Sequence, residues 1–233
     1  MDRYYKIAGL TVKMDTFGRT LKQAEPYLWD GEGTADIVIQ SERDAVQAKN
    51  PNLSAAHCEY LASGGSFYKQ LTTFDGMLLH ASAVVVDGRA YLFSAPRKTG
   101  KSTHVQLWLD HFGDRACILN DDKPALRFID GVWYAYGTPW CGKSGQNTNL
   151  QVPVAGIALI ARGEENRIAP YTGAQAIREL LEQTVRPTNP KESFRLLELM
   201  DSLLSHVPVW KLYCNMDRSA ATIAYDAMSG QKG

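Results

Sequence analysis

Between residues 77 and 136 the chain alternates short apolar runs with turn-forming residues. Two Asp-Gly pairs stand between such runs: Asp87-Gly88 separates 77–86 from 89–94, and Asp130-Gly131 separates 125–128 from 132–136. An Asp-Gly pair between strand-like runs is the signal of a two-residue hairpin turn. The pattern therefore predicts two pairs of antiparallel strands.

The spacing of apolar residues changes between these two pairs. Apolar residues recur at helical intervals over 102–112, which predicts a helix there. A third short strand is expected at 116–119, and after the polar loop 137–149 an apolar run predicts a buried strand at 154–161. This order of elements indicates a mixed α/β fold with a partly antiparallel sheet.

The two ends of the chain differ from this middle part. Residues 1–50 mix short apolar runs with turn formers, which predicts short strands, whereas 54–68 is ambiguous. Towards the C-terminus, 173–184 and 192–205 have helical spacing. The second helix carries an apolar stripe that we expect to face the core: Leu196, Leu197, Met200, Leu203 and Leu204.

Charge and composition narrow the classes of partner. The 25 lysines and arginines balance the 25 aspartates and glutamates, so no global field attracts nucleic acid or an acidic membrane. The longest apolar runs fall far short of the roughly 20 residues that cross a bilayer, and residues 1–6 are too polar for a secretory signal. We expect a cytoplasmic protein without nucleic-acid or membrane partners; a homo-oligomer stays open.

The cysteines indicate neither a zinc site nor a disulfide framework. There are four of them, they are widely spaced, and they form no C-x-x-C pair. We expect ordinary buried thiols in a reducing compartment.

The segment 95–102, Ala-Pro-Arg-Lys-Thr-Gly-Lys-Ser, predicts a phosphate-binding loop. In such a loop backbone N–H groups surround phosphate oxygens, a lysine reaches the outer phosphates and a hydroxyl binds Mg²⁺. Gly100, Lys101 and Ser102 match this pattern, whereas Ala95 replaces its first glycine. The alternative is an ordinary turn in which a hydroxyl residue caps the following helix. The strand before the loop and the helix after it favour nucleotide binding.

The whole loop is therefore a candidate nucleotide site. Its expected contacts are Ala95, Pro96, Arg97, Lys98, Thr99, Gly100, Lys101, Ser102 and Thr103. Arg97 and Lys98 either add positive charge against a triphosphate or a second phosphorylated ligand, or form a solvated loop tip.

Asp121 and Asp122 follow the predicted strand 116–119. Phosphoryl transfer to a hydroxyl needs a metal shell and a carboxylate that accepts the proton, and the pair can supply both. Residues alone leave open which aspartate takes which role, and a simple turn cap is the alternative. His80, on the neighbouring strand, is either structural or a partner of one aspartate.

Three further cations are weaker candidates for substrate contacts. Lys143 lies in the polar loop 137–149, a type of element that can close over substrate. Arg162 and Arg167 flank a polar turn after the buried strand, where they either contact phosphate or are solvated.

Taken together, these residues resemble the catalytic domain of HPr kinase/phosphorylase and its relatives, which share a nucleotide-binding core with ATP-dependent phosphoenolpyruvate carboxykinase. The resemblance spans roughly residues 76–165 and rests on His80, the Asp87-Gly88 turn, 94–103 and 119–122. It implies a mixed-sheet core with a P-loop. We expect one domain over 1–233, divided into an N-terminal α+β elaboration at 1–75, a P-loop core at 76–170 and a helical C-terminal part at 171–233.

The resemblance also implies roles for particular residues. Lys101 and Ser102 would bind phosphate and metal, Asp121 would be the acceptor base with His80 as its partner, and Asp122 would belong to the metal shell. Relatives usually have the loop G-x-x-G-x-G-K-S, so Ala95 and Lys98 replace two glycines. Thr103 also stands where the bifunctional enzymes have an acidic residue, and the C-terminal HPr-recognition signature has no counterpart.

The expected function is an ATP- and Mg²⁺-dependent kinase that transfers the γ-phosphoryl group to a hydroxyl acceptor, such as a serine of a peptide or protein. Two alternatives stay open. One is a phosphotransferase or carboxykinase-like enzyme acting on a small metabolite. The other is a degenerate nucleotide-binding module that regulates a partner.

Overall fold

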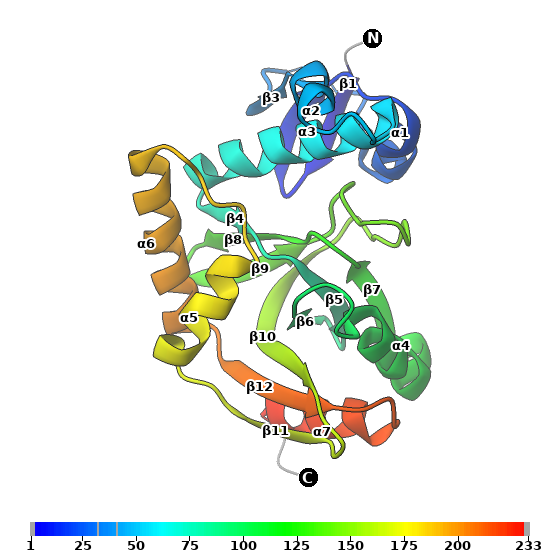
Figure 1. Cartoon of the computed structure of the whole chain (residues 1–233), viewed down its shortest axis with the longest axis vertical. Helices are drawn as coiled ribbons and strands as arrows, with labels where there is room; N and C mark the ends of the chain where they lie inside the picture. Colours follow the sequence, from blue (N-terminus) through cyan, green and yellow to red (C-terminus); the bar gives the residue numbers. More distant parts are fainter. Residues whose placement is uncertain (1–2, 32, 41, 231–233) are drawn as a thin grey trace.

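The larger sheet of the computed structural model has the strand order β4-β8-β9-β10-β6-β5-β7, with β12 paired to β10 and β11 to β12 (Figure 1). The structure describes residues 3–31, 33–40 and 42–230. The protein is mixed α/β, as predicted. The strands of this sheet are β4 (Gly76–Leu78), β5 (Ala81–Val86), β6 (Arg89–Ser94), β7 (Ala116–Asn120), β8 (Ala125–Ile129), β9 (Val132–Tyr136), β10 (Gln151–Arg162), β11 (Arg167–Pro170) and β12 (Val209–Cys214).

Both predicted hairpins are confirmed. β5 pairs antiparallel with β6, and β8 pairs antiparallel with β9. At the first turn Asp87 and Gly88 have φ values of 50° and 74°, and the second turn has the same left-handed pair of residues. Two consecutive residues with positive φ match the right-handed twist of the flanking strands, which is why Asp-Gly is selected there.

The apolar run 77–86, expected as one strand, is divided at Leu79 and His80. β4 pairs with β8, whereas β5 pairs with β6 and β7. The strand breaks because the His80 N–H donates to the Gln183 carbonyl at 2.6 Å and the His80 carbonyl accepts from the Ser94 hydroxyl at 2.9 Å. His80 therefore lies at a break in the sheet, where its side chain can leave the plane of the strand.

β10 is the longest strand, and it joins two differently oriented parts of the sheet. Its first residues pair antiparallel with β9, while its later residues pair parallel with β6 and β12. The carboxyl ends of β6, β10 and β12 consequently meet at one edge. Helix α4 (Lys101–Phe112) begins at this edge, one short loop after β6.

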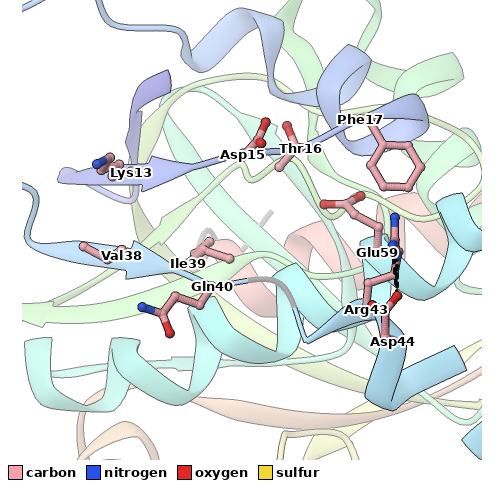
Figure 2. Close-up of a pocket in the computed structure, with 10 residues that line it drawn as sticks. All are labelled: Lys13, Asp15, Thr16, Phe17, Val38, Ile39, Gln40, Arg43, Asp44 and Glu59. Carbon is pink, nitrogen blue, oxygen red and sulfur yellow. Dashed lines mark hydrogen bonds and ion pairs between the residues drawn. The ribbon is translucent and has the colours of Figure 1, made fainter. Parts of the chain in front are cut away.

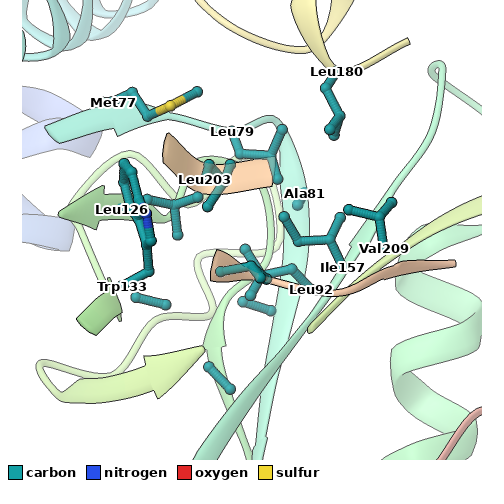
Figure 3. Close-up of a cluster of buried hydrophobic side chains, with 14 of the residues drawn as sticks. Met77, Leu79, Ala81, Leu92, Leu126, Trp133, Ile157, Leu180, Leu203 and Val209 are labelled. Carbon is teal, nitrogen blue, oxygen red and sulfur yellow. The ribbon is translucent and has the colours of Figure 1, made fainter. Parts of the chain in front are cut away.

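Helices cover both faces of the larger sheet. Helices α5 (Gly173–Glu182) and α6 (Pro190–His206) cover one face, and Figure 3 shows their Leu180 and Leu203 among the buried side chains of strands such as Ile157. Helices α4 and α7 (Ser219–Ser229) form the other apolar layer, around Trp108 and Phe93. No helix in the described part of the chain is long and apolar enough to span a membrane.

The C-terminal region contains two elements, β12 and α7, that were not predicted. Both expected helices are present, but β12 follows them and is inserted beside β10. Within α6 the expected stripe is partly wrong: Leu199 is buried, whereas Leu197 is 47% exposed. The helix packs on the sheet through a face rotated slightly from the one that the stripe suggested.

A smaller sheet and three helices form the N-terminal unit, which we define as residues 3–74. Its sheet has the order β1 (Arg3–Ile7), β2 (Leu10–Met14) and β3 (Ile37–Ile39), and its helices are α1 (Gly18–Ala24), α2 (Arg43–Lys49) and α3 (Ala55–Leu71). The ambiguous segment 54–68 is thus mostly helical, with Ser54 capping α3. Short 3₁₀ turns lie at Glu25–Tyr27, Thr72–Phe74 and Gly113–Arg115.

The N-terminal unit packs closely against the loop 137–149. A Cβ built on Gly64 of α3 would lie 2.8 Å from the Trp140 ring, so only glycine permits this approach. Trp140 also stacks on Phe67 with ring centroids 4.8 Å apart and donates to the Ser63 hydroxyl. The two parts therefore share one apolar cluster, and the N-terminal unit is fixed next to the end of β7.

Candidate functional site

The segment 95–100 forms the expected loop between β6 and α4. Lys98 and Gly100 have left-handed backbones, with φ values of 66° and 121°, whereas Ala95 is not among the positive-φ residues and is 3% exposed. Alanine in place of the first glycine therefore causes no backbone strain at position 95. The strained position is Lys98, where the resembling family has another glycine.

Helix α4 begins without a side-chain cap. Its N-cap is Gly100, and no side chain in the described residues accepts a hydrogen bond from its first turn. The alternative in which a hydroxyl residue merely caps the helix is therefore wrong. Uncapped first-turn N–H groups and the positive end of the helix dipole are what a phosphate group requires.

Lys101 turns back over this loop. Its Nζ donates to the Ala95 carbonyl at 2.7 Å, which holds the ammonium group across the opening. Burial lowers the pKa of Lys101, and the nearby carboxylates of Asp122 and Asp121 oppose that shift. The lysine is thus partly desolvated, next to both aspartates, and positioned to contact an outer phosphate.

Asp121 faces the phosphate loop. Its Oδ1 accepts hydrogen bonds from the Ser102 hydroxyl at 3.0 Å and from the Ser82 hydroxyl at 2.8 Å. A hydroxyl and a carboxylate oxygen side by side are ligands that Mg²⁺ accepts, with phosphate oxygens and waters completing its shell. No cluster of three or more His, Cys, Asp or Glu residues that could hold a metal occurs among the described residues.

Asp122 contacts a different set of side chains. Its Oδ1 lies 3.1 Å from His80 Nε2, and its Oδ2 lies 3.5 Å from Lys123 Nζ. Burial raises the pKa of Asp122, but the hydrogen bond from His80 and the charge of Lys123 more than offset this, and the pKa lies below its usual range. Asp122 is therefore an ionised acceptor at neutral pH.

The expected pairing of His80 with Asp121 is wrong, because the histidine contacts Asp122. His80 Nδ1 lies 2.9 Å from Gln183 Oε1, so the end of α5 fixes both the backbone and the ring of this histidine. Nothing in the local sequence could reveal Gln183, which is 103 positions away.

Asn120 directly precedes the two aspartates and forms a turn that gives them different directions. Its buried side-chain oxygen accepts from the N–H groups of Asp122 and Lys123 at 3.1 and 2.7 Å, and its amide donates to the Thr138 carbonyl. These bonds form an Asx turn that redirects the chain after Asp121. This role of Asn120 was not predicted, although an asparagine before two aspartates at a strand end is a recognisable turn signal.

A cavity of about 720 Å³ adjoins the phosphate loop, in the size range of small-molecule sites. It is lined by 98–104, Arg162, Gly163 and 214–216, the segments that follow β6, β10 and β12. Arg162 donates to the Lys98 carbonyl at 2.7 Å, so it braces the loop tip. Arg167 instead lies 4.1 Å from the Tyr213 ring centroid, on the edge strand β11, and does not line this cavity.

Lys143 lies on the other side of Asp122, in the exposed part of the loop 137–149. The preceding Gly142 packs on Asp122, since a Cβ there would be 2.9 Å from the Asp122 Cβ. The Gly142 N–H donates to the Tyr60 hydroxyl at 2.9 Å, and Gln23 donates to its carbonyl at 3.1 Å. The loop is thus anchored to α1 and α3 while Lys143 remains accessible.

A second cavity, of about 630 Å³, lies within the N-terminal unit (Figure 2). None of the predicted site residues lines it. Its inner wall includes Glu59, which is 1% exposed and bonded by the Thr20 hydroxyl, and burial raises the pKa of this carboxyl. Figure 2 shows the Arg43–Asp44 pair next to Glu59.

All four cysteines are free. Cys58, Cys141 and Cys214 are buried, and Cys117 is partly buried, as expected of ordinary thiols.

Comparison with known proteins yields little at the level of sequence. No protein-family model matches the chain, and no curated protein matches it. Among solved structures, the chain is similar to one described as the structure of the Hpr(Ser) kinase/phosphatase from Coxiella burnetii, with a TM-score of 0.37 and 12% identity over 67% of this chain and 99% of the other. A likeness this remote carries no argument about activity.

Proposed function

We propose that this protein is a kinase that transfers the γ-phosphoryl group of ATP to a hydroxyl acceptor. The observation that carries the proposal is that the two aspartates have different partners: Asp121 contacts Ser102 of the phosphate loop, whereas Asp122 contacts His80. A site with a metal-binding carboxylate and a separate proton acceptor has the parts that phosphoryl transfer to a hydroxyl needs.

The proposed nucleotide contacts come from the loop and the adjoining cavity. The first-turn N–H groups of α4 and the ammonium of Lys101 bind the phosphates, while the 720 Å³ cavity accepts the nucleoside. Ser102 and Asp121 hold Mg²⁺, which neutralises charge on the β- and γ-phosphates when bound.

Asp122 acts as the proton acceptor in this proposal. The acceptor oxygen forms a bond to the γ-phosphorus, the bond to the β–γ bridging oxygen breaks, and ADP leaves while the hydroxyl proton passes to Asp122. His80 holds the carboxylate in place through its Nε2 contact, and Gln183 holds the ring. The roles of the two aspartates are thus the reverse of those that the family resemblance implied.

The test is formation of a phosphorylated product. The full chain is incubated with Mg²⁺ and ATP, GTP or pyrophosphate, together with a panel of hydroxyl metabolites and serine peptides, and products are identified by mass. We expect ADP and one phosphorylated acceptor in equal amounts. Lys101→Ala should abolish both, whereas Lys191→Ala, at an exposed position of α6, should change neither.

Two results would overturn the proposal. Stoichiometric nucleotide binding without any product across the panel supports a regulatory nucleotide-binding module. ADP formation that is stimulated by carboxylate ligands but never by hydroxyl compounds supports a carboxykinase-like reaction. We further propose that the enzyme acts in the cytoplasm as one domain whose N-terminal unit completes the site.

A further inference from the structure

Two cations from different parts of the chain lie on the ring of Tyr60. The guanidinium carbon of Arg19, in α1, is 3.8 Å from the ring centroid, and Lys123 Nζ, directly after the aspartates, is 4.7 Å from it. Tyr60 is 2% exposed, and its hydroxyl accepts from the Gly142 N–H. The N-terminal unit therefore brings an arginine to the side of the site where Asp122 lies.

Two more cations act on the same region. Burial lowers the pKa of His57, and the charges of Arg19, Lys123, Lys143 and Arg97 lower it further. We call these four residues the cation cluster. They come from α1, the turn after β7, the loop 137–149 and the phosphate loop. Arg19 and Lys123 share the Tyr60 ring, and the Tyr60 hydroxyl accepts from the residue directly before Lys143.

Little negative charge balances the cation cluster. Among the described residues, its single ion pair joins Lys123 to Asp122 at 3.5 Å. Arg19 interacts electrostatically with the Glu59 carboxyl. This carboxyl is buried and accepts a hydrogen bond from the Thr20 hydroxyl, and burial raises its pKa. In a chain of zero net charge, this is a local excess of positive charge that an anion would relieve.

Arg19 is not needed to pack the helices together. The Thr20 hydroxyl bonds to Glu59 across α1 and α3, and Gln23 ties α1 to the loop 137–149. Arg19 instead lies over the Tyr60 ring, and a guanidinium group offers paired N–H donors for a bidentate oxyanion contact.

We propose that the cation cluster binds an oxyanion, a phosphate or carboxylate group, carried by the same molecule as the acceptor hydroxyl. This inference rests on the proposed function: the oxyanion is held between Arg19, Lys123 and Lys143, and the hydroxyl then lies next to Asp122. Neutral hydroxyl compounds are excluded as good substrates, because they would leave the cluster unneutralised.

The proposal is tested by binding, without turnover. Inorganic phosphate is titrated calorimetrically into the full chain saturated with Mg²⁺ and a non-hydrolysable ATP analogue, so that the γ-phosphate position is already filled. We expect saturable binding of one phosphate. Arg19→Gln should weaken it about tenfold, the loss expected for one charged bidentate contact.

Two further variants separate a local contact from a general loss of charge or of folding. Lys143→Gln, in an exposed loop, should also weaken phosphate binding several-fold. Lys22→Gln removes one charge from the exposed side of the same helix as Arg19 and should leave binding unchanged. All three variants should keep the wild-type affinity for the ATP analogue.

A second titration identifies the source of the oxyanion. Competition by acetate or succinate as strong as that by phosphate indicates a carboxylate-bearing acceptor, whereas weak competition indicates a phosphorylated one. The proposal fails if wild-type protein binds no phosphate, or if Arg19→Gln and Lys22→Gln bind it equally. Those failures leave the kinase proposal intact, because that proposal is tested by product formation and by Lys101→Ala.

Discussion

The two sides of the aspartate pair differ in the partners that they offer. On the phosphate-loop side, Asp121 meets two neutral hydroxyls, Ser82 and Ser102. On the side of the N-terminal unit, Asp122 meets an imidazole and an ammonium group. Hydroxyls leave a carboxylate free to share a metal ion, whereas the imidazole and the ammonium group favour its ionised form.

The two sides also differ in construction. The phosphate-loop side is built from consecutive residues, since β6, the loop and α4 follow one another in the chain. The other side is assembled from the end of α5, the loop 137–149 and the N-terminal unit. The loop itself can thus be encoded locally, while the surroundings of Asp122 depend on long-range packing and can change with each attached segment.

Replacing one aspartate at a time is the most direct test of whether the two sides have different roles. Asp122→Asn should slow single-turnover transfer about 10²- to 10⁴-fold, the range for loss of a general base, while Mg²⁺–nucleotide affinity stays near wild type. Asp121→Asn should instead raise the Mg²⁺ concentration needed for half-maximal nucleotide binding. If Asp121→Asn removes transfer at saturating Mg²⁺ and Asp122→Asn does not, the assigned roles are reversed.

The phosphate-loop side contains a buried histidine, which gives a second test. His104, in α4, is 2% exposed and accepts a hydrogen bond from Trp108, and burial lowers its pKa from 6.5 to about 4. Unfolded protein therefore binds this proton more readily, so stability is complete above pH 6.5 and falls as the pH drops from 6.5 towards 4. The shift corresponds to about 3 kcal/mol.

Urea unfolding between pH 7 and pH 4 measures this loss. His104→Gln keeps an acceptor for the Trp108 indole but has no titrating group, so its stability should depend less on pH by that amount. His206→Gln, at the exposed end of α6, is the control and should retain the wild-type dependence. Equal slopes for all three proteins would show that His104 does not contribute.

Gly142 offers a way to disturb only the Asp122 side. Its φ is +72°, and a Cβ there would lie 2.9 Å from the Asp122 Cβ. Gly142→Ala should slow transfer by about tenfold or more by displacing the carboxylate, and should destabilise the fold by about 1–2 kcal/mol through backbone strain. Nucleotide affinity should not change, because the phosphate loop is untouched.

Gly145→Ala is the matched control for that substitution. Gly145 has nearly the same φ, +71°, but the nearest atom to its added Cβ would be Gln23 Nε2 at 3.7 Å. It should therefore show the strain without the loss of activity. Equal loss of transfer in both variants would assign the effect to the loop as a whole and not to contact with Asp122.

The local elements were largely predictable from the sequence. Asp87-Gly88 and Asp130-Gly131 specify their turns because few residues adopt positive φ, and the strand-loop-helix order around Lys101 specifies the phosphate loop. The break at His80 was not predictable, since apolar spacing continues through it. The bonds that cause this break come from Gln183 and Ser94, and only the folded chain brings these residues together.

The candidate site also has a part that local sequence predicts and a part that depends on tertiary packing. Lys101, Ser102, Asp121 and Asp122 were identified from motif spacing, but the direction in which each aspartate faces depends on the Asx turn at Asn120. The contribution of the N-terminal unit had no sequence signal, because α3 contains Gly64 and Gly65 and its period is obscured. Gly64 is present for contact with Trp140, a requirement of tertiary packing.

The smallest expected effect concerns the phosphate loop. It tests whether the residues that replace the family's glycines impair this loop. Lys98 has φ of 66°, a conformation that disfavours a residue with a Cβ, and Lys98→Gly should stabilise the fold by up to about 1 kcal/mol. Arg97→Gly, at a position without positive φ, should destabilise it by a similar amount, since glycine adds only unfolded-state freedom. Thermal or urea unfolding of both variants measures this.

Nucleotide binding by the same two variants decides what the lysine does. Arg162 bonds to the backbone carbonyl of Lys98, so the loop tip keeps its brace in Lys98→Gly, and nucleotide affinity should change by less than about twofold. Such a result would mean that the loop tolerates lysine at a modest conformational cost and is not degenerate. A gain in affinity of tenfold or more in Lys98→Gly would mean that the lysine obstructs the site, and the regulatory-module alternative would then be favoured.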